Sequence, residues 1–352
     1  MKLLIINPGS TSTKIGVFEN EASVYEATLR HSIEELAPFA QMTDQYDFRM
    51  GIIVAELAKA GILVEELDAV VGRGGLVKPL TGGTYYVNEA MLHDLRIGLQ
   101  GQHASNLGGL IANAISQKIG KPAFIVDPVV VDEFMEISRI SGHPLIKRRS
   151  IFHALNQKAI ARQYAKDAGR GYDQLNLVVV HMGGGISVGI HEKGRVIDVN
   201  NALDGEGPLS PERSGTLPTG DLAALCFSGQ HSHGEVKKMI AGNGGLVAYF
   251  GSNNMMELEE RAATDAEVKL HMDAMCYQIA KEIAAVSAAV CGQVDAILLT
   301  GGMAHSEYLT AEVTKRIKFI APVHKYPGED ELAALAQGAL RVLRGEEDAQ
   351  EY

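Results

Sequence analysis

The sequence predicts an α/β protein built from two related domains. The chain has 352 residues, a length that suits two ordinary domains. Apolar runs typical of strands alternate with helical patterns along it. An apolar run, a turn rich in small residues and a second strand-like run occur together at 3–18 and again at 177–191. A repeat at a spacing of about 170 residues indicates a duplicated domain.

The elements between and after the two hairpins follow from the apolar pattern. Ser150 is a typical N-cap, because its hydroxyl can accept a free backbone N–H at a helix start. The segment 266–291 carries apolar side chains at steps of three and four, a stripe typical of a helix that faces the core. We expect helices over 49–60, 104–119, 150–167, 266–291 and 330–343, and strands over 68–72, 123–126 and 296–299.

No low-complexity linker separates the two halves. We place the domain boundary near Arg149, so that residues 1–149 and 150–329 form the two domains. The final segment, 330–352, is expected to rejoin the first domain. The least regular stretch, 200–221, is rich in Gly and Pro, and a long irregular stretch in a compact protein is often functional.

Composition excludes several classes of function. The net charge of -11 disfavours nucleic acid as a partner, although a few arginines can still attract an anionic substrate into a cleft. The three cysteines, Cys226, Cys276 and Cys291, form no CxxC pair, so we expect neither a disulfide framework nor a zinc site. Ordinary free thiols are typical of a cytoplasmic protein, which we therefore expect. No apolar stretch is long enough for a signal peptide or a membrane span.

The turn of the first hairpin offers Asn7, Ser10, Ser12 and Lys14. A small polar turn exposes N–H groups and hydroxyls, which suits phosphate. It is not a Walker A loop, since no Gly precedes Lys14 and a strand follows. The alternative is a plain hairpin turn with polar tips. Two such turns that face each other across a cleft would hold the two ends of a polyphosphate.

Two further glycine motifs follow strands. Gly183, Gly184 and Gly185 precede a strand rather than a helix, so they are not a dinucleotide fingerprint and instead indicate close approach of the backbone to a ligand. Gly301 and Gly302 follow a buried strand, where open α/β sheets bind ligands. A simple helix-start turn is the alternative for that pair.

Several charged residues are candidates beside ordinary alternatives. Arg73 and Arg213 are flanked by glycine, which leaves room for two-pronged contact with a carboxylate or phosphate, although most single arginines are surface charges. His153 is a catalytic candidate or a capping histidine. Asp127 precedes a proline and is a turn former or a magnesium contact. The acidic run 329–331 suits a helix start for dipole reasons alone.

Taken in order, these motifs resemble the acetate kinase family of the acetate and sugar kinase/Hsp70/actin superfamily. The resemblance spans essentially the whole chain, and it implies a duplicated ribonuclease-H-like, actin-like fold with ATP in the cleft between the domains. The motifs that carry it lie at 7–14, 73–75, 152–153, 181–185, 213–215 and 300–302.

The resemblance also implies roles for residues by position. Nucleotide binding, of ATP or ADP, falls to Asn7, Ser10, Ser12, Lys14, His181, Gly183, Gly184, Gly185, Gly301 and Gly302. The catalytic cluster falls to Arg73, His153 and Arg213. The acidic residues near Mg²⁺ are Asp127 and either Asp330 or Glu331.

The chain departs from the family's acetate-specific members at two places. Gln157 stands where they carry a second His, in the motif that begins at Phe152. Gly75 replaces a bulkier residue at a position that, by resemblance, lines the acyl pocket with Phe152. We expect the missing side chain to leave room for further methylenes, each worth about 0.8 kcal/mol when buried. A longer acyl chain than acetate is therefore favoured.

The implied reaction joins ATP and a short-chain carboxylate, such as butyrate or a branched analogue, to give an acyl phosphate and ADP, and runs in reverse. An ionised carboxylate needs no general base, so catalysis is positioning and charge neutralisation. The alternatives are an acetate or propionate kinase, a sugar kinase, which needs an aspartate base, and a nucleotide switch, which needs a partner-binding domain. The resemblance further implies a homodimer or larger homo-oligomer.

Overall fold

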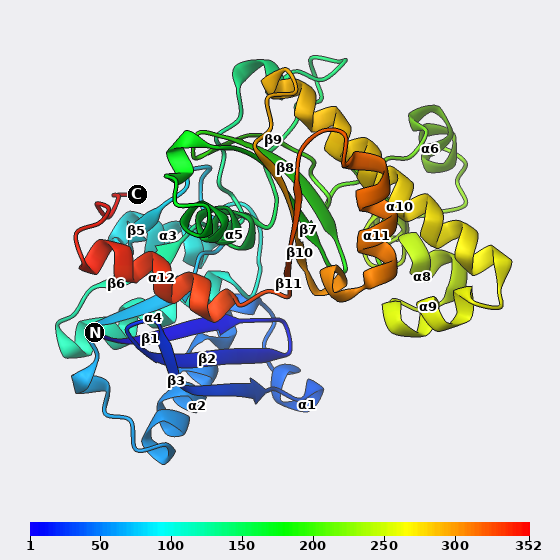
Figure 1. The fold of residues 1–352 in the computed structure, drawn as a ribbon. Helices are drawn as coiled ribbons and strands as arrows, with labels where there is room; N and C mark the ends of the chain where they lie inside the picture. The colour runs from blue at the N-terminus through cyan, green and yellow to red at the C-terminus, as the bar shows by residue number, and fades with distance from the viewer. The chain divides into compact units, whose positions relative to one another are not determined.

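The computed structural model describes residues 1–352, and its contacts divide the chain into two compact units. Unit 1 consists of Met1–Val131 and Asp330–Tyr352, and unit 2 of Asp132–Glu329. Each unit contains one mixed β-sheet with helices packed on it (Figure 1). The predicted domain boundary near Arg149 stays a prediction.

The sheet of unit 1 has six strands: β1 (Lys2–Pro8), β2 (Ser12–Glu19), β3 (Ala22–Arg30), β4 (Ala69–Arg73), β5 (Thr84–Tyr86) and β6 (Ala123–Val126). Their order across the sheet is β3-β2-β1-β4-β6-β5. β1 pairs antiparallel with β2, while β1, β4 and β6 run parallel. The parallel strands are buried along nearly their whole length, as their apolar runs require.

Unit 1 has five helices, and two of them lie on these parallel strands. The helices are α1 (Ile33–Leu36), α2 (Tyr46–Lys59), α3 (Glu89–Ile97), α4 (Asn106–Ile119) and α12 (Glu331–Leu343), with short 3₁₀ turns at Met42–Gln45 and Val64–Glu66. Both α4 and α12 contact β1, β4 and β6. A Cβ atom on Gly72 of β4 would lie 2.2 Å from the carbonyl oxygen of Gly108 in α4. Glycine therefore lets α4 lie directly on the strand that ends in Arg73.

The sheet of unit 2 has five strands: β7 (Asn176–Met182), β8 (Ile186–Glu192), β9 (Arg195–Val199), β10 (Ala296–Gly301) and β11 (Val323–Pro327). The order is β11-β10-β7-β8-β9. β7 pairs antiparallel with β8 and parallel with β10, as β1 does with β2 and β4. The order β3-β2-β1-β4-β6 of unit 1 thus recurs as β9-β8-β7-β10-β11. The predicted duplication is confirmed.

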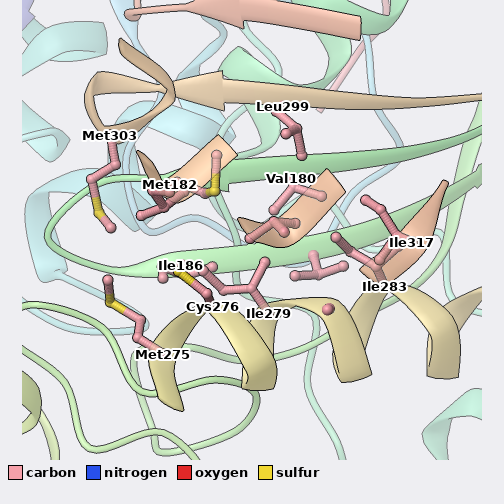
Figure 2. Close-up of a cluster of buried hydrophobic side chains, with 14 of the residues drawn as sticks. Val180, Met182, Ile186, Met275, Cys276, Ile279, Ile283, Leu299, Met303 and Ile317 are labelled. Carbon is pink, nitrogen blue, oxygen red and sulfur yellow. The ribbon is translucent and has the colours of Figure 1, made fainter. Parts of the chain in front are cut away.

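The long helix α10 closes the main core of unit 2. The helices are α5 (Ala154–Asp167), α6 (Thr219–Cys226), α7 (His233–Ile240), α8 (Gly245–Phe250), α9 (Met255–Ala262), α10 (Ala266–Ser287) and α11 (Glu307–Ile317), with 3₁₀ turns at Glu136–Arg139, Tyr172–Gln174, Ala288–Val290 and Gly302–His305. Figure 2 shows Met275, Ile279 and Ile283 of α10 directed toward Val180 and Ile186 of the sheet. The apolar stripe predicted for this helix is buried throughout, and its core role is confirmed.

One predicted helix start is wrong. Helix α5 begins at Ala154 with His153 as its N-cap residue, and not at Ser150. The chain stays non-helical over 150–153, and Phe152 is only 3% exposed there. The buried ring of Phe152 thus lies in the non-helical segment before α5, and His153 follows it at the helix start.

Two features of the structure concern membrane spans and thiols. No helix is both long enough and apolar enough to cross a bilayer. Cys226, Cys276 and Cys291 are all free thiols.

Candidate active site

Three polar side chains of unit 1 meet where two parallel strands end. In the β1–β4 pair Ile6 lies opposite Gly72, so Asn7 and Arg73 reach the same edge of the sheet. Nη1 of Arg73 lies 2.6 Å from Oε1 of Glu331 and donates to Oδ1 of Asn7 at 3.1 Å. Nδ2 of Asn7 donates to Oε2 of Glu331 at 2.6 Å. The fold therefore joins residues from both ends of the chain in one charged cluster.

The two acidic residues at the start of α12 have different surroundings. Oδ1 of Asp330 caps the helix by accepting the N–H of Ala333 at 2.8 Å. The carboxylate of Glu331 instead engages Asn7 and Arg73. Of the two candidates that the sequence left open, Glu331 joins the cluster and Asp330 serves the helix.

A buried arginine that the sequence analysis missed supports the turn between β1 and β2. Arg49 of α2 is fully buried. Its guanidinium donates to the carbonyl oxygens of Gly9, Ser10 and Ser12 at 2.7, 2.8 and 3.1 Å. Its other donors have side-chain partners on neighbouring residues. These bonds fix the shape of the first candidate phosphate turn from its inner side.

No carboxylate pairs with Arg49, although it is charged. Burial lowers the pKa of its guanidinium to about 10, which keeps the group protonated at neutral pH. The carbonyl dipoles of the turn offset part of the cost of burying this charge. The side chains of Ser10 and Lys14 are exposed on the same turn. Positive potential within the turn favours an anion there.

Asp127 lies just beyond β6 with its carboxylate buried. Its Oδ1 accepts the N–H of Gly83 at 2.7 Å, which holds the loop before β5. Its φ of 37° is uncommon for a residue with a side chain, and such strain often accompanies functional positions. Asp127 therefore has a structural task, and its metal role stays a prediction.

Gly75 does not open the space that the sequence analysis expected. A Cβ atom there would lie 2.6 Å from Cδ2 of Leu95 and 2.6 Å from Oδ1 of Asn106. Oδ1 of Asn106 also accepts the N–H of Leu76 at 2.8 Å, so this side chain is held in place. Neighbouring side chains fill the place of the missing one, and the inference of an enlarged acyl pocket from Gly75 is corrected. Phe152 is buried, and its role in a pocket stays a prediction.

In unit 2 two histidines from different elements stack on each other. The rings of His153, at the start of α5, and His181, in β7, are 3.8 Å apart and within 13° of parallel. Nδ1 of His181 lies 2.8 Å from Oδ1 of Asn156, and its Nε2 lies 3.4 Å from Oε2 of Glu329. The structure thus joins two candidates that the sequence placed in separate motifs.

Arg213 lies against the glycine turn that follows β7. A Cβ atom on Gly185 would lie 2.1 Å from Nη1 of Arg213, so only glycine leaves room for the guanidinium here. The loop is anchored at Gly184, whose carbonyl oxygen accepts Oγ of Ser210 at 2.6 Å and the N–H of Glu212 at 3.2 Å. The guanidinium forms no salt bridge, and burial lowers its pKa. A cation at a glycine turn without a paired carboxylate suits a phosphate group.

The remaining glycines of the motifs have different structural surroundings. The N–H of Gly183 donates to the carbonyl of Gly185 at 3.1 Å and closes the turn. Gly301 has φ of 87°, and a Cβ atom on it would lie 2.3 Å from the carbonyl oxygen of Met182. Gly302 is exposed, and a Cβ atom there would meet nothing within 4 Å. Gly301 therefore joins two strand ends, whereas Gly302 faces open space that a ligand can enter.

A buried ion pair that no sequence pattern signals anchors the helix that His153 begins. Nζ of Lys158 in α5 lies 3.0 Å from Glu133. Oε2 of Glu133 also accepts the N–H of Val196 at 2.7 Å, and Lys158 donates to the carbonyl of Gly194 at 3.1 Å. Both charges thus have further hydrogen bonds, which a buried pair needs in order to be tolerated.

A magnesium ion bound together with a nucleotide would need few ligands from the protein. No group of three or more His, Cys, Asp and Glu side chains is placed to hold a metal by itself. Mg²⁺ commonly takes only one or two carboxylates, with waters and phosphate oxygens as its other ligands. The carboxylates of Glu331 and Asp127, both oxygen donors at strand or helix ends in unit 1, are compatible with that mode.

Comparison with known proteins gives a consistent result. The model of the Acetokinase family matches residues 139–325. Butyrate kinase 1 of Clostridium acetobutylicum is 58% identical over 352 residues, covering 100% of this chain and 99% of the relative. Butyrate kinase 2 of the same organism is 55% identical with the same coverage.

A solved structure shows the same architecture. The acetate kinase of Porphyromonas gingivalis superposes with a TM-score of 0.79 at 20% identity, covering 97% of this chain and 99% of that one. The α/β fold of two related domains predicted from the sequence is confirmed.

Proposed function

Because the chain belongs to the acetokinase family, we propose that it transfers the γ-phosphoryl group of ATP to a short-chain carboxylate and catalyses the reverse, ATP-forming reaction. The products of the forward reaction are an acyl phosphate and ADP. The relatives that match the whole chain at 58% and 55% identity are named butyrate kinases, so we propose butyrate or a branched analogue as acceptor.

The observation that carries the mechanism is the unpaired guanidinium of Arg213 at the glycine turn. Both reactants are anions, so the main barrier is electrostatic, and a fixed cation lowers it where charge develops on the phosphoryl group. His153 would donate a hydrogen bond to an equatorial oxygen of that group. Gly302 and the turn 183–185 would lie against the nucleotide.

In unit 1 we assign the carboxylate to Arg73. Its contacts with Asn7 and Glu331 both use Nη1, which leaves Nε and Nη2 as donors for a second carboxylate. The turn that Arg49 supports, with Ser10, Ser12 and Lys14, would bind nucleotide phosphate. Glu331 and Asp127 would hold Mg²⁺, which when bound neutralises charge on the phosphates.

Location and assembly belong to the same proposal. Three free thiols without a disulfide fit the reducing cytoplasm, where we place the enzyme. We also propose a homodimer or larger homo-oligomer, which light scattering after gel filtration would test.

The deciding experiment traps acyl phosphate with hydroxylamine. Mg-ATP is offered with acetate, propionate, butyrate, valerate and isobutyrate at equal concentration. A maximum at butyrate or isobutyrate supports the proposal. A maximum at acetate would keep the carboxylate kinase but overturn the acceptor, and no product from any acid would overturn the reaction itself.

A further inference from the structure

His153 is one end of a chain of hydrogen-bonded side chains that runs through the interior of unit 2. Oη of Tyr172 lies 2.7 Å from Nδ1 of His191, and Nε2 of His191 lies 3.0 Å from Oε1 of Gln157. Nε2 of Gln157 lies 2.9 Å from Oγ of Ser187, which lies 3.0 Å from Nδ1 of His153. Gln157, Ser187 and His191 are completely buried.

The direction of this chain is fixed at Gln157. Its Nε2 also donates to the main-chain carbonyl oxygen of Ser187 at 3.0 Å. A carbonyl oxygen can only accept, so the side of the amide that faces Ser187 must be the NH₂ group. The amide oxygen then faces His191 and can only accept from it. Nε2 of His191 therefore carries a proton.

The far end of the chain agrees with this direction. Burial, together with the nearby cations Lys158 and Arg162, lowers the pKa of His191 well below its usual value, so the ring is neutral at pH 7. A neutral imidazole has one N–H, and in His191 it is on Nε2. Nδ1 must then accept, and the hydroxyl of Tyr172 donates to it.

The near end sets the state of His153. Oγ of Ser187 accepts from Gln157, so the serine's own proton needs another acceptor. Among the contacts of this buried hydroxyl, Nδ1 of His153 is the one atom that can accept it. Nδ1 is then occupied as an acceptor, and a neutral His153 carries its proton on Nε2.

We propose that Gln157 and Ser187 are positioning residues that fix His153 in the Nε2–H tautomer, ready to donate to the phosphoryl group in transfer. The last clause rests on the proposed function, whereas the tautomer does not. Gln157 suits this task because its amide makes two donations and one acceptance here.

The test reads the tautomer directly. Protein labelled with ¹⁵N-histidine is examined by ¹H–¹⁵N correlation NMR at pH 7.5 without substrate, and the His153 signals are assigned by their loss in His153→Gln. We expect an unprotonated Nδ1 and a protonated Nε2. In Ser187→Ala the donor to Nδ1 is gone, so both tautomers should be populated. A proton on Nδ1 in the native protein, or an unchanged tautomer in Ser187→Ala, would overturn the proposal.

Kinetics separate this proposal from the proposed function. Ser187→Ala should lower kcat by about 10-fold to about 100-fold, with KM for ATP changed less than about 2-fold, since the donor stays in place but loses its preferred state. Ser287→Ala is the matched control: it removes another buried serine hydroxyl of unit 2, bonded to Ile283, and should move neither the tautomer nor kcat. If the tautomer changes as expected but kcat does not, the hydrogen-bonded chain fixes the tautomer as proposed, and the catalytic role of His153 is refuted.

Discussion

Arg49 and Arg213 show at the scale of single residues how a protein of net charge -11 can receive anions. Neither guanidinium is paired with a carboxylate, and each lies at a turn between two strands. Arg49 donates hydrogen bonds to carbonyl groups of its turn, whereas Arg213 lies in the space that the missing side chain of Gly185 leaves. A cation whose charge is not already neutralised by a carboxylate keeps its field for a ligand. We therefore expect both turns to attract an anionic ligand, as the proposed function requires.

The contact between Gly185 and Arg213 gives a sharp prediction. In Gly185→Ala the new methyl group would collide with the end of a flexible side chain, so the fold should survive while Arg213 moves. Because misplacement of a catalytic group by about 1 Å can cost about 10²-fold, we expect turnover at saturating ATP to fall by at least about 10²-fold, which is far more than any loss of ADP affinity at this turn. Acyl phosphate formation and calorimetric titration of ADP measure the two effects.

Two variants control this prediction. Gly184→Ala, where the Cβ atom would lie 3.2 Å from the carboxylate of Glu212, should have a much smaller effect on turnover. Arg213→Ala should lower turnover by about 10³-fold or more, as the loss of an arginine finger does. Equal loss of ADP affinity and turnover in Gly185→Ala would contradict the assigned role.

Some residues of the candidate site could be predicted from the sequence and others could not. The motifs brought Arg73, His153 and Arg213 to notice because glycine or a strand end stands beside them. Arg49 and Ser187 carry no such signal, since their partners include backbone carbonyls and side chains distant in sequence. Gly75 misled the analysis because an absent side chain was read as free space, whereas in the fold other side chains fill it.

At the scale of elements, the two buried hairpins were predictable because long apolar runs flank a turn of small residues. The strands β3 and β11 were not predicted, and both are largely exposed or half-buried, so their apolar signal is weak. Helices α6 to α9 fell in or after the stretch rich in glycine, where short helices give little periodicity. The strands β5 and β9 were not predicted either, although most of their residues are buried, because runs of three and five residues give little pattern; exposure therefore explains only part of what the sequence did not reveal.

The junction of β7 and β10 allows a paired test of two adjacent glycines. Gly301→Ala would force a Cβ atom to within 2.3 Å of a main-chain oxygen at a positive φ, and we expect a loss of about 2 to about 4 kcal/mol of stability. Gly302→Ala meets nothing within 4 Å and should leave the melting temperature unchanged. Differential scanning calorimetry should show a drop of at least about 4 °C for the first variant alone.

Nucleotide binding by Gly302→Ala completes this test. If the open face of Gly302 lies against the nucleotide, the added methyl group should weaken ATP binding although stability is unchanged. A variant that binds ATP as tightly as the native chain would exclude that position from the nucleotide site. A stable Gly301→Ala would instead refute the packing argument for the strand ends.

At the scale of the whole molecule, folding lowers the pKa of three histidines that are spread over both units. Burial is the largest cause of the lowered pKa of His31 and His103 in unit 1 and of His191 in unit 2, and a nearby arginine or lysine acts in the same direction. In the unfolded chain each would titrate near its usual pKa of about 6.5. Unfolding below that pH therefore takes up protons, and acid favours the unfolded chain.

We accordingly expect the urea midpoint of unfolding to fall as pH is lowered from about 6.5 toward 5, because the unfolded state binds more protons there than the folded state. Each histidine that stays neutral in the fold adds up to about 1.4 kcal/mol per pH unit to this slope, until the pH reaches its folded pKa. His191→Asn should reduce the slope between pH 6.5 and 5 by about one such share, whatever it does to the midpoint at pH 8. If the slope in His191→Asn equals that of the native protein, His191 takes up a proton in the folded state. The row of hydrogen-bonded side chains that ends at His153 would then lose its fixed direction at Tyr172 in acid.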